Sequence, residues 1–232
     1  MPHAYICSLD YAKNIEKCGW GSVRLIAELD TMIELLNCDC MEYMATVPDK
    51  YFDLAIVDPP YGLGDKLTQG GTWASKYAKG DASWDIAPPA EYWEQLFRVS
   101  KNQIVWGGNY FGLPSNRCFI IWDKVAHMDT LADCEYAWTS FDRNAKIFKH
   151  VRNTSETRIH ICQKPVKLYE WLLTNYAKKG QKILDTHLGS GSSAIAAHYF
   201  GVDFVGCELD KDYFEAAKAR FDMATKQLAM SI

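Results

Sequence analysis

The sequence predicts one α/β domain with an open, mostly parallel sheet and helices on both faces. Three observations predict this fold. A chain of 232 residues suits a single such domain, short apolar runs alternate with helical patterns, and two of the runs end in segments typical of ligand-binding turns. Hydrophobic residues make up 48% of the chain and charged residues 23%, which excludes a disordered chain.

The elements can be placed in order along the chain. Residues 1–30 are treated as an N-terminal extension of unknown role, in which residues 22–29 could be a short helix or a strand, and residues 31–232 as the single domain. Short apolar runs predict strands at residues 31–36, 53–57, 103–106, 118–122, 135–140, 182–185 and 204–207. Helical spacing of apolar residues predicts helices at residues 39–46, 88–99, 166–177, 192–200 and 212–226. Residues 62–84 form a long polar connection, and a loop of this length is usually functional or mobile.

Targeting signals and cysteine usage indicate the compartment. No apolar run reaches the roughly 18–20 residues that span a bilayer, and the N-terminus lacks the basic patch and apolar stretch of a signal peptide. The sequence therefore predicts a soluble cytoplasmic protein with no membrane partner. The eight cysteines are scattered without a C-x-x-C pair, which favours buried free thiols. Cys38 and Cys40 would lie on the same side of a strand, where the two thiols could form half of a zinc site. This is the less favoured alternative, because the spacing fits no common structural zinc site.

Charge is distributed unevenly. The net charge of −4 argues against a basic coat over the whole surface, but it does not exclude a local basic face. Residues 142–167 hold seven cationic and two anionic side chains, a local charge of +5. This stretch could contact phosphates or could simply be a solvated surface.

A glycine-rich segment follows the strand predicted at residues 182–185. It reads D-T-H-L-G-S-G-S-S from Asp185 and leads into a helix. Its two glycines let the backbone approach a ligand closely, and a helix N-terminus attracts polar or anionic groups. Glu208, 23 residues after Asp185, ends the next strand, where an acid can bind ribose hydroxyls. The pair indicates an adenosine-like cofactor; the alternative is an ordinary strand–helix turn with a surface acid.

The segment Asp58-Pro59-Pro60-Tyr61 ends another predicted strand. The prolines have no N–H, so the Asp58 carboxylate and the Pro59 carbonyl are two adjacent acceptors for the protons of an exocyclic amino group. Two accepted hydrogen bonds return electron density to the amino nitrogen, which could then attack an electrophilic methyl group, while Tyr61 stacks on the base. This interpretation requires the two segments to lie close together and Asp58 to be free of an internal ion pair. The alternative is a proline-rich turn with a capping Asp.

Taken together, the two segments resemble those of the DNA amino-methyltransferases that use S-adenosylmethionine (SAM). The Asp-Pro-Pro-Tyr segment precedes the glycine-rich segment by about 125 residues, which looks like the permuted arrangement of the β group. Smaller matches are N-C-D-C-M-E at residues 37–42 and Q-K-P at residues 163–165, and the resemblance covers residues 31 to about 221. Asp in the first position of the Pro-Pro motif resembles adenine-N6 enzymes more than cytosine-N4 enzymes. The resemblance implies a Rossmann-like SAM-dependent methyltransferase fold.

The resemblance also implies residue roles. Asp58 and the Pro59 carbonyl would bind the target amino group, Pro60 would keep the turn rigid and Tyr61 would stack on the extruded base. Asp39 would approach the adenine of the cofactor, Lys164 its carboxylate and Glu208 its ribose. The full cofactor-binding set is Asp39, Lys164, Asp185, Gly189, Ser190, Gly191, Ser192 and Glu208. No metal is expected. His187 stands where the family usually has Phe, and a tolerated aromatic replacement is favoured over a hydrogen-bonding or titrating role.

DNA recognition would require the target base to leave the stack. Residues 142–160 lie where the family places its recognition region, but they are few, so either the loop at residues 62–84 shares this role or the recognised site is short. The candidate phosphate contacts are Lys66, Lys76, Lys79, Arg143, Lys146, Lys149 and Arg152. The lysines of the loop could equally be solubility charges.

The resulting prediction is a site-specific enzyme that transfers a methyl group from SAM to adenine N6 in DNA, in a bacterial or phage-infected cell. An RNA adenine methyltransferase, a DNA cytosine-N4 methyltransferase and a catalytically silent SAM- or nucleic-acid-binding subunit remain as alternatives. The recognition sequence, a possible homodimer, and the choice between a restriction partner, a phage role and a maintenance role are open.

Overall fold

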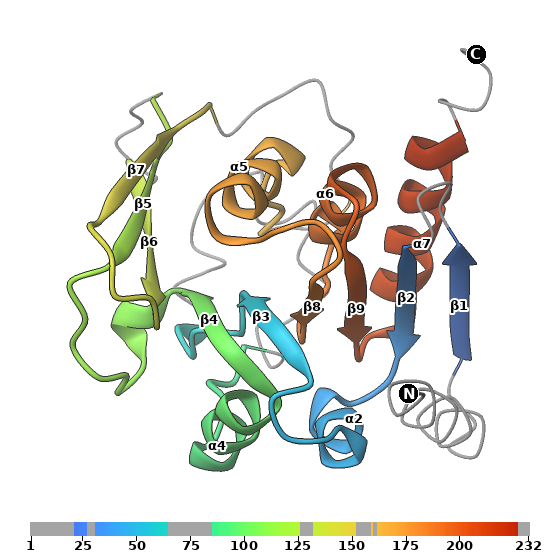
Figure 1. Cartoon of the computed structure of the whole chain (residues 1–232), viewed down its shortest axis with the longest axis horizontal. Helices are drawn as coiled ribbons and strands as arrows, with labels where there is room; N and C mark the ends of the chain where they lie inside the picture. The colour runs from blue at the N-terminus through green and yellow to red at the C-terminus, as the bar shows by residue number, and fades with distance from the viewer. Residues whose placement is uncertain are drawn as a thin grey trace, which may run out of the picture.

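A computed structural model describes residues 21–26, 31–64, 85–125, 132–151, 159 and 162–226, with side chains from residue 31 onward. Within these ranges the strands form one nine-stranded sheet in the order β1-β2-β9-β8-β3-β4-β6-β5-β7 (Figure 1). The strands are β1 (Gly21–Ile26), β2 (Met32–Asn37), β3 (Phe52–Val57), β4 (Ser100–Trp106), β5 (Phe119–Asp123), β6 (Cys134–Thr139), β7 (Lys146–Lys149), β8 (Lys182–Asp185) and β9 (Asp203–Glu208). The helices are α2 (Cys40–Thr46), α4 (Ala90–Val99), α5 (Val166–Tyr176), α6 (Ser192–Phe200) and α7 (Lys211–Lys226), with a 3-10 turn η3 (Gly108–Tyr110).

The centre of the sheet is parallel. Strands β2, β9, β8, β3 and β4 all run in the same direction, so their carboxyl ends share one edge of the sheet. Strand β1 pairs with β2 antiparallel, and β6 is antiparallel to both β4 and β5. The predicted α/β fold with a mostly parallel sheet is confirmed.

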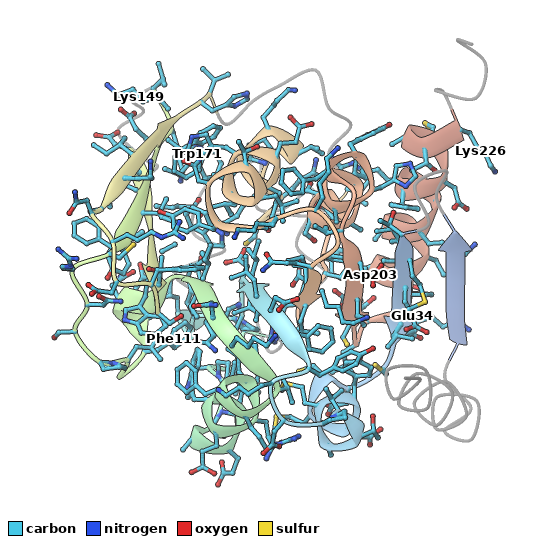
Figure 2. All side chains as sticks on the ribbon, viewed as in Figure 1. Glu34, Phe111, Lys149, Trp171, Asp203 and Lys226 are labelled. Atoms are coloured by element: carbon cyan, nitrogen blue, oxygen red, sulfur yellow. The ribbon has the colours of Figure 1, made fainter. Side chains whose placement is uncertain are left out.

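Helices cover both faces of the sheet, as the sequence predicts. In Figure 1, α5 and α6 lie on one side of the central strands and α2 and α4 on the other, while α7 packs against α6. Because successive side chains of a strand point to opposite faces, Ile56 joins the core under α5 and α6 whereas Val57 joins the core over α2 and α4. Figure 2 shows side chains filling the space between the sheet and the helices on both of its faces.

The central strands read as continuous apolar runs because they are buried on both faces. Strand β3 has the sequence F-D-L-A-I-V, and only Asp53 is not fully buried. The run stops at Pro59 and Pro60, which cannot donate to a neighbouring strand. Local sequence therefore fixes where β3 ends and where the catalytic candidate Asp58 stands.

Two strands differ from the prediction. Residues 21–26, inside the stretch set aside as an extension, form the edge strand β1, which resolves the choice between helix and strand. Residues 146–149 lie within the stretch 142–160 that is matched to the family's recognition region. They form β7 and pair in parallel with β5. The K-I-F-K sequence of β7 shows no clear alternation because it is a four-residue edge strand with only Phe148 partly buried.

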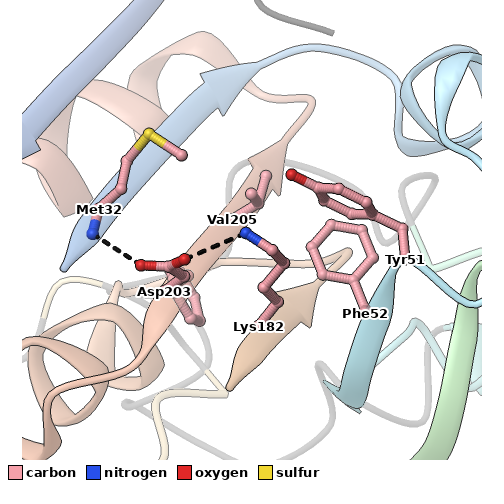
Figure 3. Close-up of a pocket in the computed structure, with 7 residues that line it drawn as sticks. Met32, Tyr51, Phe52, Lys182, Asp203 and Val205 are labelled. Atoms are coloured by element: carbon pink, nitrogen blue, oxygen red, sulfur yellow. Dashed lines mark hydrogen bonds and ion pairs between the residues drawn. The ribbon is translucent and has the colours of Figure 1, made fainter. Parts of the chain in front are cut away.

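A small pocket lies at the amino-terminal edge of the sheet (Figure 3). Its lining comes from the first residues of β2, β3, β8 and β9, namely Met32, Phe52, Lys182, Asp203, Phe204 and Val205, together with Tyr51. Asp203 accepts a hydrogen bond from the Met32 amide and another from Lys182. Open parallel sheets bind ligands at the carboxyl edge, so this pocket is a gap between strand starts rather than the candidate site. Among the described residues, no helix combines the length and apolarity needed to cross a bilayer.

Packing of α5 on the sheet gives a stability prediction. Leu172 is fully buried in the core shared by α5, α6 and the sheet. Leu172→Ala should lower the free energy of unfolding by about 2–5 kcal/mol because it leaves a cavity. Thr174→Ala, an exposed change on the same helix, should stay within about 0.5 kcal/mol. Urea unfolding followed by circular dichroism measures both, and equal effects would contradict this packing.

Candidate active site

The two segments singled out in the sequence lie side by side. Asp58 follows β3 and Asp185 ends β8, and these strands are parallel neighbours paired through Ala55 and Leu184. Glu208 ends β9, the next strand. The predicted proximity of the two segments is therefore confirmed, and both stand at the edge where parallel sheets bind ligands.

The glycine-rich turn is held from several directions. Gly191 has φ +72°, and a Cβ atom there would come within 3.3 Å of the Ala217 carbonyl oxygen, so the position requires glycine. The Gly189 amide donates to Glu208 Oε2 (2.9 Å). Arg220 of α7 donates to the Ser190 carbonyl and to Ser192 Oγ. These contacts preform the turn as a backbone cradle, and its two glycines have no side chain that could keep a ligand from the backbone.

Two carboxyl groups lie at this turn, the buried Asp185 and the half-buried Glu208 at the end of β9. Asp185 accepts hydrogen bonds from Ser193 Oγ (2.6 Å) and the His187 amide (3.0 Å), and burial raises its pKa to about 7. Glu208 also accepts from the Asp210 amide (3.0 Å), and burial raises its pKa as well. Both groups would gain from a cationic ligand, because positive charge favours the ionised carboxylate.

His187 takes part in a hydrogen-bond relay. Its Nδ1 lies 2.9 Å from Thr186 Oγ1, which lies 2.6 Å from the Tyr92 hydroxyl. The buried phenol of Tyr92 has Thr186 as its hydrogen-bond partner in the described part of the chain, so the network assigns Tyr92 as donor to Thr186, Thr186 as donor to Nδ1, and the imidazole proton to Nε2. Burial lowers the pKa of His187 to about 4, which keeps the ring neutral at pH 7. His187 also meets the Tyr92 ring edge to face, so it combines aromatic packing with hydrogen bonding.

The Asp58 carboxylate is engaged on both oxygens. Oδ1 accepts a hydrogen bond from the Tyr61 hydroxyl (2.7 Å), and Oδ2 forms an ion pair with Lys164. Lys164 also pairs with Glu135 (3.2 Å), which in turn pairs with Lys124 (2.9 Å). The expectation that Asp58 is free of an internal ion pair is wrong, and that requirement is too strict, because Glu135 gives the same ammonium group a second anionic partner. Lys164 immediately precedes the N-cap of α5, and that position brings its ammonium group to the strand ends.

Two carboxylates and two ammonium groups balance in this cluster. The Lys164 side chain is only 3% exposed. Burial alone would lower the pKa of Lys164, but Asp58 and Glu135 raise it above its usual value. Burial alone would raise the pKa of Glu135, but Lys164 and Lys124 lower it to about 2. Lys164 and Glu135 are therefore charged at neutral pH, and each has an oppositely charged partner.

Aromatic contacts fix the Tyr61 ring. It stacks on Tyr110 at 5.0 Å between centroids and meets Phe111 edge to face at 6.2 Å. It also rests on Gly107, where a Cβ atom would lie 2.2 Å from Tyr61 Cε1. Burial and the neighbouring Asp58 raise the pKa of the phenol, so it stays a hydrogen-bond donor.

The remaining cofactor candidate, Asp39, caps α2 by accepting from the Met41 amide (2.7 Å). It follows Cys38, whose amide donates to the Glu208 carbonyl, so Asp39 stands at the same edge. The nearby thiols are not activated: burial raises the pKa of Cys40 to about 12 and raises that of Cys207. Within the described ranges, no cluster of three His, Cys, Asp or Glu side chains is arranged to hold a metal ion.

Three of the candidate phosphate contacts can be located. Lys146 and Lys149 lie on the edge strand β7, and Lys149 is 3.8 Å from Asp123. Arg143 donates to the Asn175 carbonyl and lies over the rings of Phe141 and Tyr176. The other four candidates, Lys66, Lys76, Lys79 and Arg152, lie outside the described residues.

Several residues of the site have no signal in the sequence. Glu135 and Lys124 reach it because β6 starts, and β5 ends, at the edge where β4 ends. Asp85 accepts hydrogen bonds from four consecutive backbone amides, from Tyr61 at the end of the Asp-Pro-Pro-Tyr segment to Gly64. A single acid in a strand or after a loop forms no motif. Only the abrupt end of the long loop at Trp84-Asp85 could have drawn attention to Asp85.

Comparison with known proteins identifies the family. The family model described as "DNA methylase", which covers N6-adenine and N4-cytosine enzymes, matches residues 88–219. The chain belongs to this family, and the predicted membership of the DNA amino-methyltransferases is confirmed. It is a DNA methyltransferase whose cofactor is SAM, as predicted. The glycine cradle and the half-buried carboxylate of Glu208 at the tip of β9 fit that cofactor.

A relative supports this assignment, and solved structures show the same fold. Type II methyltransferase M2.DpnII of Streptococcus pneumoniae is 35% identical over 241 residues, covering 81% of this chain and 89% of its own. Type II methyltransferase M.HinfI of Haemophilus influenzae is 22% identical, covering 82% and 68%. The crystal structure of the M1.HpyAVI–SAM complex superposes with a TM-score of 0.53 at 20% identity, covering 82% and 100%. PvuII DNA methyltransferase (cytosine-N4-specific) superposes with 0.59 at 12% identity, covering 84% and 90%.

The contact between Tyr61 and Gly107 gives a prediction. Gly107→Ala should displace the Tyr61 ring, because the new Cβ would overlap it and because the residue has φ +67°. We expect the methylation rate at saturating substrates to fall at least about tenfold, since small misplacements near reacting groups have large effects.

Gly112→Ala is the matched control, because a Cβ there meets nothing within 4 Å. It should keep the wild-type rate in a tritiated-SAM assay. Equal rates for both variants would show that the Tyr61 ring position does not matter.

Proposed function

We propose that this DNA methyltransferase transfers the SAM methyl group to the N6 amino group of adenine at a specific DNA site. The observation that carries the proposal is the position of Asp58-Pro59-Pro60-Tyr61 at the end of β3, beside the glycine-rich turn that ends β8. A double acceptor for an amino group and a methyl donor would then meet at one edge of the sheet. The Asp in the first motif position supports adenine.

The ion pair of Asp58 defines what the reaction requires. Oδ2 already contacts Lys164, and a carboxylate oxygen can accept a second hydrogen bond, so an amino group can donate to it beside the ammonium group. Glu135 lies 3.2 Å from the same ammonium group, so Lys164 stays paired while Asp58 accepts from the base. The Pro59 carbonyl is the second acceptor. Methyl transfer would break the S–CH3 bond and leave its electron pair on the SAM sulfur, and the proton lost by the amino nitrogen would then pass to Asp58 or to water.

The cofactor-binding candidates keep hydrogen-bond donors and acceptors for this role. Each Glu208 oxygen accepts one backbone amide, and each carboxylate oxygen can accept a second hydrogen bond, here from a ribose hydroxyl. Lys164 has three N–H donors and pairs with two carboxylates, which leaves one donor for an anionic end of the cofactor. Asp39 would face the adenine, while Asp185 and Ser192 shape the turn. Bound SAM supplies the electrophilic methyl group.

Cytosine-N4 methylation is the second candidate, because the same acceptor pair fits the N4 amino group of cytosine. The structural likeness to PvuII DNA methyltransferase is at 12% identity and concerns the fold alone. An RNA substrate and a silent subunit remain alternatives. The relatives named as type II methyltransferases support a restriction-modification setting.

The product nucleoside decides among these candidates. We expect DNA from cells that lack adenine methylation and express this protein to contain N6-methyldeoxyadenosine after digestion and mass analysis. N4-methyldeoxycytidine instead would move the activity to cytosine, and methylation of RNA oligonucleotides alone would move it to RNA. SAM binding without any transfer would favour the silent subunit. Sequencing of modified bases would give the recognition site.

The role of Asp58 gives a separate prediction. Asp58→Ala should reduce methyl transfer at least about 100-fold, the range seen when one group that stabilises a transition state is removed. SAM binding measured by calorimetry should survive, because Lys164 keeps Glu135 as a partner. Asp49→Ala, a change at a carboxylate that is 76% exposed and paired with Arg98, should leave both quantities unchanged. A parallel loss of SAM binding in Asp58→Ala would contradict the assigned role.

A further inference from the structure

One buried carboxylate binds the backbone amides at the end of the Asp-Pro-Pro-Tyr segment and just after it. Asp85 is 5% exposed. Its Oδ1 accepts from the amides of Tyr61 (2.9 Å) and Gly62 (3.1 Å), and its Oδ2 accepts from those of Leu63 (2.5 Å) and Gly64 (2.8 Å). Four consecutive N–H groups therefore converge on a single side chain. Such contacts compensate for the burial of the carboxylate charge.

The backbone conformation explains how four amides converge. Gly62 has φ +71° and Gly64 has φ +55°, so left-handed residues alternate with ordinary ones. This alternation turns successive N–H groups inward and makes an anion-binding concavity. A Cβ at Gly62 would lie 3.1 Å from the Ala87 Cβ, so this glycine also fits against the chain just beyond Asp85.

The Asp85 carboxylate connects the two ends of the segment that runs from Gly64 to Asp85. Asp85 lies 21 residues after Gly64 in the sequence, and its side chain joins the two described ends of this segment. One end carries Tyr61, whose amide is bound by Asp85 and whose hydroxyl donates to Asp58 Oδ1. Asp85 is thus linked to Asp58, the proposed amino-group acceptor, by two hydrogen bonds, one to the Tyr61 amide and one from the Tyr61 hydroxyl.

We propose that Asp85 is a positioning residue for methyl transfer, which orients the Asp58 carboxylate through the Tyr61 backbone and hydroxyl. This inference rests on the function proposed for Asp58. Prolines 59 and 60 restrict φ but offer no N–H by which the turn could be anchored. The anchoring therefore falls to the next four amides, and Asp85 is their common acceptor.

Asp85→Asn tests the proposal with little change of shape. The amide has one acceptor oxygen, and its NH2 group would face two backbone N–H donors. We expect kcat to fall at least about tenfold, whereas the dissociation constant for SAM stays within about twofold. Asp49→Asn, the exposed control, should match the wild type in both. A kcat within twofold of wild type in a folded Asp85→Asn protein would overturn the proposal, and so would a loss of SAM affinity equal to the loss of kcat.

A double-mutant cycle separates positioning from a merely structural role. Tyr61→Phe removes the hydroxyl that contacts Asp58 and keeps the ring. If Asp85 acts through that hydroxyl, Asp85→Asn should cost at least threefold less in kcat in the Tyr61→Phe background than in the wild type. Multiplicative losses would show that Asp85 does not act through Tyr61.

A direct readout does not depend on activity. Amide protons bound to a carboxylate resonate at low field, so the signals of Gly62 and Gly64 in glycine-labelled protein should move upfield in Asp85→Asn. Unmoved signals would mean that the four contacts do not form. If wild-type protein showed these signals but methylated no adenine, the adenine proposal would fail, while kcat on the base that is methylated would still test Asp85.

A second variant covers the case in which Asp85→Asn does not fold. Gly62→Ala keeps the carboxylate and disturbs the turn through its positive φ and its contact with Ala87. It should lower kcat at least about tenfold with SAM affinity retained. An active Gly62→Ala protein, within twofold of wild type, would count against the proposal.

Discussion

The buried ammonium group of Lys164 between Asp58 and Glu135 is the interaction on which the site depends. It joins the end of β3, the start of β6 and the residue before the N-cap of α5, so the parallel and antiparallel halves of the sheet meet at one charge cluster. Burying a charge is costly, and a buried ammonium group left with no anionic partner typically destabilises a protein by about 3–5 kcal/mol. The cluster therefore constrains how the two halves of the sheet are placed.

The same cluster shapes the chemistry. A carboxylate that must accept hydrogen bonds from a weakly nucleophilic amino group has to be ionised and oriented. Lys164 forms an ion pair with one oxygen of Asp58, and the Tyr61 hydroxyl donates a hydrogen bond to the other. Across the adjacent strand ends, burial raises the pKa of Asp185 and Glu208, so this side gains stability when a cation binds. Under the proposed function, the positive sulfonium of SAM would be that cation.

Much of the fold and part of the site are readable in the sequence, for physical reasons. The strands of the parallel centre are buried on both faces and appear as uninterrupted apolar runs, and the long helices show their 3.6-residue period. The segments after β3 and β8 are visible because prolines and glycines have few uses other than special backbone geometry. Strand β7 has only Phe148 partly buried, so no period reveals it. Glu135 lies 77 residues from Asp58, and only the strand order β3-β4-β6 brings them together.

The Asp58 corner shows why a motif alone gives an incomplete account of a site. Its residues predict two acceptors on a stiff frame, but stiffness within four residues does not fix the frame relative to the rest of the protein. That attachment comes from partners without pattern: the Lys164 ammonium, the missing Cβ of Gly107 under the Tyr61 ring, and the Asp85 carboxylate under the next turn. Each of these partners is a single residue whose effect depends on tertiary position. A motif therefore predicts what chemistry a segment can do. The position and orientation of its reacting groups are set by contacts that only the folded chain makes.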